Sequence, residues 1–156
     1  MQAQRTCAHC LMILAAAGIC GLLFNLTAPQ GVGLSPEAVT NPLWDRIELP
    51  QAQSLHQSGA LFVDARDVDH YQVARIRGAV SLSPAEWDIL YPLLRSTLSD
   101  ASAVVVYGRT LSRFPAAVTA QKLKREGLRN VHVVSEPIEA LRDAGLPISE
   151  PRRRSR

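Results

Sequence analysis

A strongly apolar, β-branched run that ends in a glycine, a short loop and a helical pattern constrains this chain more than any other feature. The run is Ala103–Tyr107; Gly108 and residues 109–113 follow it, and a helical pattern opens at Phe114. A short apolar run of this kind is typical of a buried strand. In a strand–loop–helix unit, unpaired backbone N–H groups and the helix dipole point into the turn and favour an anion there. The sequence therefore predicts an anion cradle at residues 108–113.

The cysteines of the chain all lie outside this cradle. Enzymes that handle sulfur or phosphate place a cysteine at the first loop position, where the local field stabilises a thiolate. This chain has Gly108 there, and Cys7, Cys10 and Cys20 precede the domain. Cys7 and Cys10 have the spacing of a redox or zinc half-site without a second pair. We therefore expect no catalytic residue in the domain, no metal site and no cofactor.

Strands and helices are predicted to alternate along the chain. Strands are expected at residues 46–49, 61–63, 79–82, 104–107 and 131–134, and helices at 50–55, 67–73, 116–126 and 138–144. Ser83–Glu86 has the Ser-x-x-Glu capping pattern with a proline in the first turn. The alternation predicts an α/β fold in which a parallel sheet carries helices on both faces, with ligands at the carboxyl ends of the strands.

Several short motifs, in a fixed order, resemble those of one family. They are Leu61–Asp67 with its Asp-x-Arg ending, His70-Tyr71, Ala74–Val80, Val104–Tyr107, Asn130-Val131 and Ala144–Ile148. Taken together, the segment from Trp44 to Ile148 resembles a rhodanese-like (sulfurtransferase-type) domain. The resemblance implies the parallel α/β fold and an active loop directly after Tyr107.

The loop has the length of a sulfurtransferase loop, with glycine in place of the nucleophile. Gly108 and Arg113 are five positions apart, as in the Cys-x-x-x-x-Arg pattern that the resemblance implies, whereas related phosphatases have one residue more. Three departures from the family pattern fall near this face: Leu111, Glu136-Pro137 and Arg75. They argue against residual sulfurtransferase activity.

The candidate binding site is this loop with its support from the neighbouring strand. Its residues are Gly108, Arg109, Thr110, Leu111, Ser112 and Arg113, supported by Asp64 and Arg66. Arg113 either binds an anion together with the loop amides or holds the loop by hydrogen bonds to carbonyls. Arg109 either points to solvent or sets a charge preference. The hydroxyls of Thr110 and Ser112 would need an adjacent base to act as nucleophiles, and the family pattern places no histidine there.

The charge distribution argues against a nucleic-acid-binding domain. Four of the 17 basic residues form the tail Arg152–Arg156, which leaves 13 basic against 14 acidic residues in the rest of the chain. A nucleic-acid-binding domain is expected to gather basic residues on one face. The tail is either a solvated end or, beside a membrane, a ligand for anionic headgroups.

The N-terminal segment is predicted to anchor the chain. Residues 10–24 are all apolar or glycine, and the 19 residues 10–28 would span about 28 Å as a helix, enough to cross a hydrocarbon core. A cleaved signal sequence is the alternative, although Leu26–Ala28 offers only one of the two small residues that cleavage prefers. Arg5 on the short side predicts the N-terminus inside and the domain on the periplasmic side of a bacterial inner membrane.

These observations predict one domain organisation and leave two hypotheses about function. We expect a short tail at residues 1–9, a transmembrane anchor at 10–28, a Gly/Pro-rich linker at 29–43, a rhodanese-like domain at 44–149 and a basic tail at 150–156. The favoured reading is a catalytically inactive binding or scaffolding module whose partners are the membrane, a protein and a small oxyanion. The alternative is an atypical sulfur- or phosphate-handling enzyme whose nucleophile comes from Cys7, Cys10 or a partner.

Overall fold

The computed structural model of the protein describes residues 12–21, 23–24, 38, 41–108 and 114–150. The chain divides into two compact units, Met1–Ser35 and Pro36–Arg156. The second unit contains strands β1 (Asp45–Ile47), β2 (Leu61–Asp64), β3 (Arg75–Ile76), β4 (Val80–Ser81), β5 (Val104–Tyr107), β6 (Val131–Val134) and β7 (Ile148–Ser149). Its helices are α3 (Leu49–Gln57), α4 (Val68–Val73), α5 (Trp87–Asp100), α6 (Phe114–Arg125) and α7 (Ile138–Asp143).

The central sheet is parallel, as the alternation of strands and helices predicts. Its five strands have the order β1-β6-β5-β2-β4, so β5 lies in the middle between β6 and β2. All four residues of β5 are buried, as expected for a strand that is covered on both faces. The carboxyl end of β5, where Gly108 follows, is therefore flanked by the loops that leave β2 and β6.

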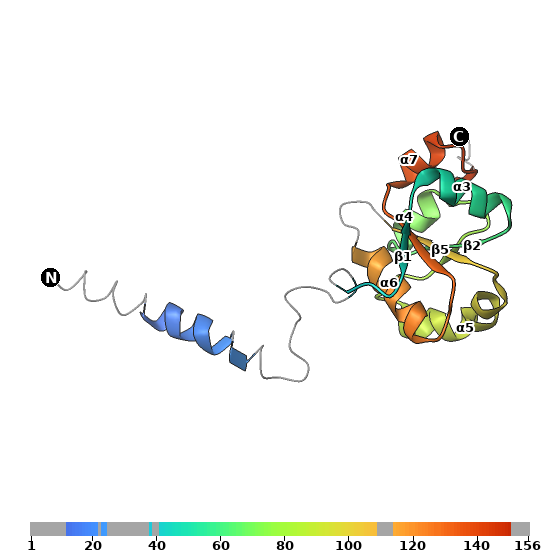
Figure 1. Ribbon diagram of the computed structural model, residues 1–156. Coiled ribbons are helices and arrows are strands. Elements are labelled where there is room, and N and C mark those ends of the chain that lie inside the picture. Colours follow the sequence, from blue (N-terminus) through green and yellow to red (C-terminus); the bar gives the residue numbers. More distant parts are fainter. Residues whose placement is uncertain (1–11, 22, 25–37, 39–40, 109–113, 151–156) are drawn as a thin grey trace. The chain divides into compact units, whose positions relative to one another are not determined.

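Helices pack on both faces of this sheet and form two cores (Figure 1). On one face, Trp87 and Leu98 of α5 and Leu123 of α6 pack against alternate valines of the strands. On the other face, Ala52 of α3 and Leu141 of α7 pack against the remaining strand side chains. The alternation of strand side chains between the faces thus gives each helix layer its own apolar surface.

Three parts of the domain differ from the sequence-based prediction. Residues 84–86 form a turn, and the long helix α5 begins only at Trp87. Ser83 and Glu86 still make the predicted contact, because Glu86 N donates to Ser83 Oγ at 3.3 Å. This helix continues through Pro92, a residue that sequence patterns treat as a helix breaker. Strands β3 and β7 form a separate antiparallel pair that the sequence did not indicate.

The first strand and helix also lie elsewhere than predicted. β1 begins at Asp45 and ends at Ile47, and Leu49 already belongs to α3. The reason is a capping box, in which the side chains of Glu48 and Gln51 each accept a hydrogen bond from the other residue's backbone N–H. This cap starts the helix before Pro50.

The predicted transmembrane helix over residues 10–28 is not supported by the described residues. Residues 12–21 and 23–24 are helical and exposed, and in this described part of the chain no helix is long and apolar enough to cross a membrane. The remaining residues of the predicted span lie outside those that the structure describes, as do Cys7 and Cys10. Cys20 is described and is an exposed free thiol.

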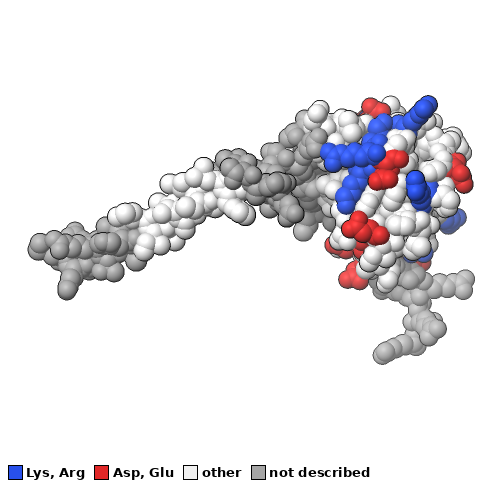
Figure 2. Space-filling view, turned by 90° about the horizontal axis from the view of Figure 1, so that it is seen from below, with Lys and Arg blue, Asp and Glu red and all other residues white. Residues whose placement is uncertain are grey.

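Charges of both signs lie next to one another on the surface of the domain. Figure 2 shows a face on which basic and acidic side chains alternate. On the face in view, no stretch of described surface carries basic side chains alone.

Candidate functional site

The centre of the predicted site, Gly108, lies buried at the end of the central strand. β2 and β5 remain hydrogen-bonded beyond their last paired residues, because Ala65 N donates to Tyr107 O at 2.8 Å. This bond places Ala65 directly beside Gly108. On the other side α6 begins at Phe114, as the sequence predicts, and brings Ala116 against the glycine.

A side chain at position 108 would contact Ala65 and Ala116 closely. A Cβ atom at this position would lie 3.2 Å from Ala65 Cβ, and 3.4 Å from both Ala116 Cβ and Ala116 N. The first distance is shorter than ordinary van der Waals contact, so Ala65 would have to move by a few tenths of an ångström. The φ angle of Gly108 is not positive, and the constraint is therefore steric rather than conformational.

The other five residues of the predicted loop, Arg109 to Arg113, lie outside the described residues. Their role in binding stays a prediction, as does the support of the loop by Asp64 and Arg66. The structure does describe the two supporting residues and their surroundings.

Asp64 and Arg66 form a buried ion pair at the carboxyl end of β2. Arg66 donates from Nη2 to Asp64 Oδ2 at 2.7 Å and from Nε to Asp64 Oδ1 at 3.0 Å, and both side chains are almost fully buried. Arg66 Nη2 also donates to Ala74 O at 2.6 Å. Burial alone would lower the pKa of Arg66, but the hydrogen bonds and the charge of Asp64 outweigh it and raise that pKa. The pair thus stays charged and holds the chain between α4 and β3.

Tyr107 joins this pair to the central strand. Its hydroxyl accepts a hydrogen bond from Ile76 N at 3.1 Å, and the Arg66 guanidinium lies 5.7 Å from its ring centroid. Burial, and next the negative charge of Asp64, raise the pKa of Tyr107 far above its ordinary value. The phenol is therefore a neutral structural group, in agreement with the sequence-based interpretation of a packed aromatic residue rather than an acid.

The motif around Tyr71 closes the same edge of the domain. Tyr71 Oη donates to Ala79 O at 2.9 Å, and the Arg75 guanidinium stacks on the Tyr71 ring at 4.7 Å. Gly78 precedes Ala79 with a φ of 82°, a conformation that favours glycine. The hydrogen bond from Tyr71 could not be predicted from the sequence, because its acceptor is a backbone atom.

The histidines are spread over the domain. His56 packs on Phe62 with ring centroids 5.4 Å apart, His70 lies on α4 and His132 on β6. Within the described ranges, no group of three or more His, Cys, Asp or Glu residues is placed to hold a metal ion.

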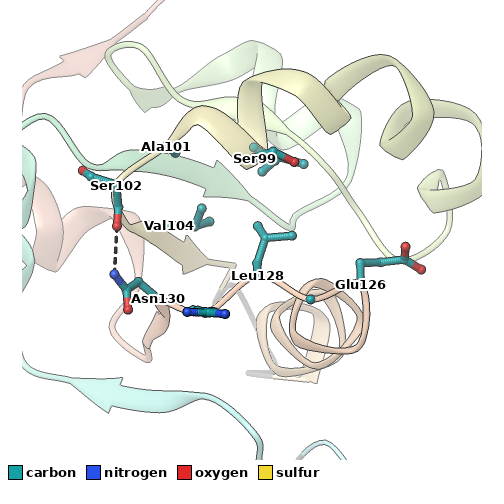
Figure 3. A pocket seen from close by; sticks show the side chains of 10 residues that line it. Ser99, Ala101, Ser102, Val104, Glu126, Leu128 and Asn130 are labelled. Carbon is teal, nitrogen blue, oxygen red and sulfur yellow. Dashed lines mark hydrogen bonds between the residues drawn. The ribbon is translucent and has the colours of Figure 1, made fainter.

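The described surface includes two clefts that bear on the search for a site. One, of about 320 Å³, lies at the amino end of the sheet, where α5 and α6 end and β5 begins (Figure 3). There Asn130 Nδ2 donates to Ser102 O at 3.0 Å. The other, of about 270 Å³, lies between α4 and α7. Because ligands of parallel α/β sheets bind at carboxyl ends, the first cleft lies at the edge where such sites are not expected.

The comparison with protein families agrees with this architecture. A family model described as "Rhodanese-like domain" matches residues 45–144. The chain belongs to the rhodanese-like domain family. None of the curated proteins compared with this chain gives a match.

Solved structures show the same fold. A protein of unknown function from Rhodopseudomonas palustris, described as a possible tyrosine phosphatase, is 24% identical with a TM-score of 0.60, covering 78% of this chain and 98% of that one. The polysulfide-sulfur transferase homodimer from Wolinella succinogenes is 21% identical with a TM-score of 0.55, covering 72% and 83%. A rhodanese-like domain from Anabaena sp. is 19% identical with a TM-score of 0.55, covering 72% and 84%.

The buried position of Tyr107 makes a prediction about stability. Tyr107→Phe should lower the free energy of unfolding by about 1–3 kcal/mol, because it leaves the buried Ile76 N–H without an acceptor. Tyr71→Phe, which removes a half-buried hydroxyl, should cost less. Urea unfolding of both variants at neutral pH measures the difference.

The same variant should change the response to alkali. The unfolded chain releases the phenolic proton near pH 10, whereas folded Tyr107 retains it. The contribution of Tyr107 to stability is thus fully present below about pH 10 and falls as the pH rises further. Between pH 10 and 12, unfolding free energies should therefore fall less steeply in Tyr107→Phe than in the parent chain. Equal slopes would contradict the burial of this hydroxyl.

Proposed function

We propose that this chain is a rhodanese-like domain without sulfurtransferase activity of its own, which acts as a binding or scaffolding module. The observation that carries the proposal is Gly108. A sulfurtransferase forms its intermediate on a thiolate, and the chain has no cysteine after Cys20. The packing of Ala65 and Ala116 around Gly108 supports the proposal, because the backbone is packed more closely here than a Cβ atom allows without a shift of Ala65.

Restoring the nucleophile tests this proposal. The parent chain should show no turnover in a thiosulfate:cyanide assay. Gly108→Cys should fold with a loss of about 1 kcal/mol, because its Cβ overpacks against Ala65. Its thiol should be alkylated with a midpoint below about pH 8.5, since the N-terminus of α6 favours a thiolate.

A double variant provides the control. Ala65→Gly combined with Gly108→Cys should remove the steric part of the loss, so the two changes should be coupled in unfolding experiments. Turnover by the parent chain would contradict the proposed inactivity. An alkylation midpoint at or above about 8.5 would contradict the cradle.

The proposed ligand of the cradle is a small oxyanion such as sulfate, phosphate or thiosulfate. The 12-residue helix α6 begins directly after the loop, and the positive N-terminal end of its dipole favours negative charge there. Gly108 adds no thiolate that would repel an anion. In this proposal Arg113, at the end of the loop, supplies the charged donor.

Anion binding should be weak and should depend on one arginine. We expect dissociation constants in the millimolar range, about −4 kcal/mol, and a rise in melting temperature when the anion exceeds this concentration. Arg113→Ala should lose most of the rise, whereas the matched variant Arg109→Ala should retain it. Thermal shift with sulfate, and chloride at equal ionic strength as a control, measures this. Equal effects of the two anions would contradict a site at the loop.

The proposed location is a membrane surface, with the apolar segment 10–28 as an uncleaved anchor and the domain on the periplasmic side. The apolar run and Arg5 support this proposal. The division of the chain at Ser35 also supports it, because the anchor segment then belongs to a unit of its own.

A topology experiment tests the location. A reporter that is active only in the periplasm, fused after residue 150, should be active, and protease should reach the domain in spheroplasts but not in intact cells. Gln2→Lys should retain this orientation because it adds charge on the same side as Arg5. Protection of the domain in spheroplasts would reverse the proposed orientation.

A further inference from the structure

The cleft between α4 and α7 is distinct from the cradle at Gly108. Its volume is about 270 Å³. Arg66 lies in it, Val73, Ala74 and Ile138 contribute apolar surface, and Asp69 and Glu139 contribute carboxylates. Asp69, Glu139 and Val73 are exposed, whereas Arg66 and Ile138 are buried.

The charges of this cleft favour a cation. The positive charge of Arg66 is balanced by Asp64, with which it forms a buried ion pair. Within the described part of the chain, neither Asp69 nor Glu139 forms an ion pair. Asp69 on α4 and Glu139 on α7 therefore give the cleft two carboxylates against one guanidinium, that of Arg66, which is already paired with Asp64 and also attracts Glu139. The imidazole of His70 lines the cleft as well.

The apolar side chains that line the cleft favour a ligand that has an apolar part as well as a positive charge. A small inorganic cation would leave Val73 and Ile138 without a partner, whereas an arginine or lysine side chain has an aliphatic stem and a charged head. Such side chains lay their stems along apolar surface while the head remains among polar groups. An arginine side chain therefore matches both the walls and the carboxylates.

The last described strand, β7, leads toward this cleft. β7 runs antiparallel to β3, with Ser149 opposite Arg75. The chain therefore continues after Ser149 toward Ala74 and Val73, which line the cleft. Arg142, which lies three residues after Glu139 on α7, forms an ion pair with Glu150. The next six residues, 151–156, contain four arginines and can extend at most about 20 Å.

We propose that the cleft between α4 and α7 is a docking site for an arginine-rich segment, and that residues 151–156 of the same chain occupy it. The site lies apart from residues 108–113 and does not depend on anion binding there. A partner with a basic segment can then bind only by displacing the chain's own arginines.

The test measures competition between the tail and a peptide. The probe is a fluorescent peptide of sequence Pro-Arg-Arg-Arg-Ser-Arg, and the protein is the full chain in neutral detergent at low salt. The tail variant R152Q/R153Q/R154Q/R156Q should bind the probe at least tenfold more tightly than the parent chain. Adding Asp69→Asn and Glu139→Gln to this variant should reduce binding about tenfold. Adding Val73→Lys, which leaves both carboxylates in place, should also reduce it.

A matched control removes the same charge elsewhere. Asp45→Asn with Asp100→Asn neutralises two exposed carboxylates outside the cleft, on β1 and α5, and should leave probe binding unchanged. Equal binding to the parent and the tail variant would overturn occupation by the tail. Equal loss in the control and in the cleft variant would overturn the cleft as the site. Competition that weakens on dilution would assign the cleft to a second copy and also overturn the proposal.

Discussion

The ion pair between Asp64 and Arg66 is the interaction on which the carboxyl edge of this domain depends. A buried carboxylate is costly unless it is paired and hydrogen-bonded, and Asp64 is fully buried. Its partner Arg66 reaches Ala74 O, and Tyr107 beside it accepts the N–H of Ile76. One pair thereby connects β2, β3 and β5. Without it, Ala74 O would lose a hydrogen-bond donor and the Tyr107 ring its contact with Arg66.

The two proposed binding surfaces, one for an anion and one for arginine side chains, lie at the same edge of the sheet. Because β5 lies between β2 and β6, the loops that leave its neighbours reach past its end. The helix α6 on one face offers N–H groups, which favour anions. On the other face, α4 and α7 carry Asp69 and Glu139. The ion pair contributes to this contrast, because Arg66 is paired with Asp64 and so compensates Asp69 and Glu139 only in part.

The sequence was most informative where a pattern is local. β5 and β6 have the predicted bounds, and the first residue of α6 was expected, because apolar runs and helix starts are read from neighbouring residues. The capping pattern at Ser83–Glu86 indicated a helix start that is too early, because α5 begins at Trp87. The pairing of β3 with β7 was missed, because each strand has two residues and no periodicity. At the site, the glycine was evident from the sequence, whereas the contacts of Ala65 and Ala116 depend on packing between distant segments.

The close packing around Gly108 has a consequence for any side chain placed at this position. A cysteine introduced there by a single mutation would bring its Cβ to 3.2 Å from Ala65 Cβ, so Ala65 would have to shift by a few tenths of an ångström. A nucleophile at position 108 would therefore be gained at a cost in stability unless position 65 changed as well. The chemistry available at the end of β5 is thus coupled to the size of a side chain that follows a different strand, β2.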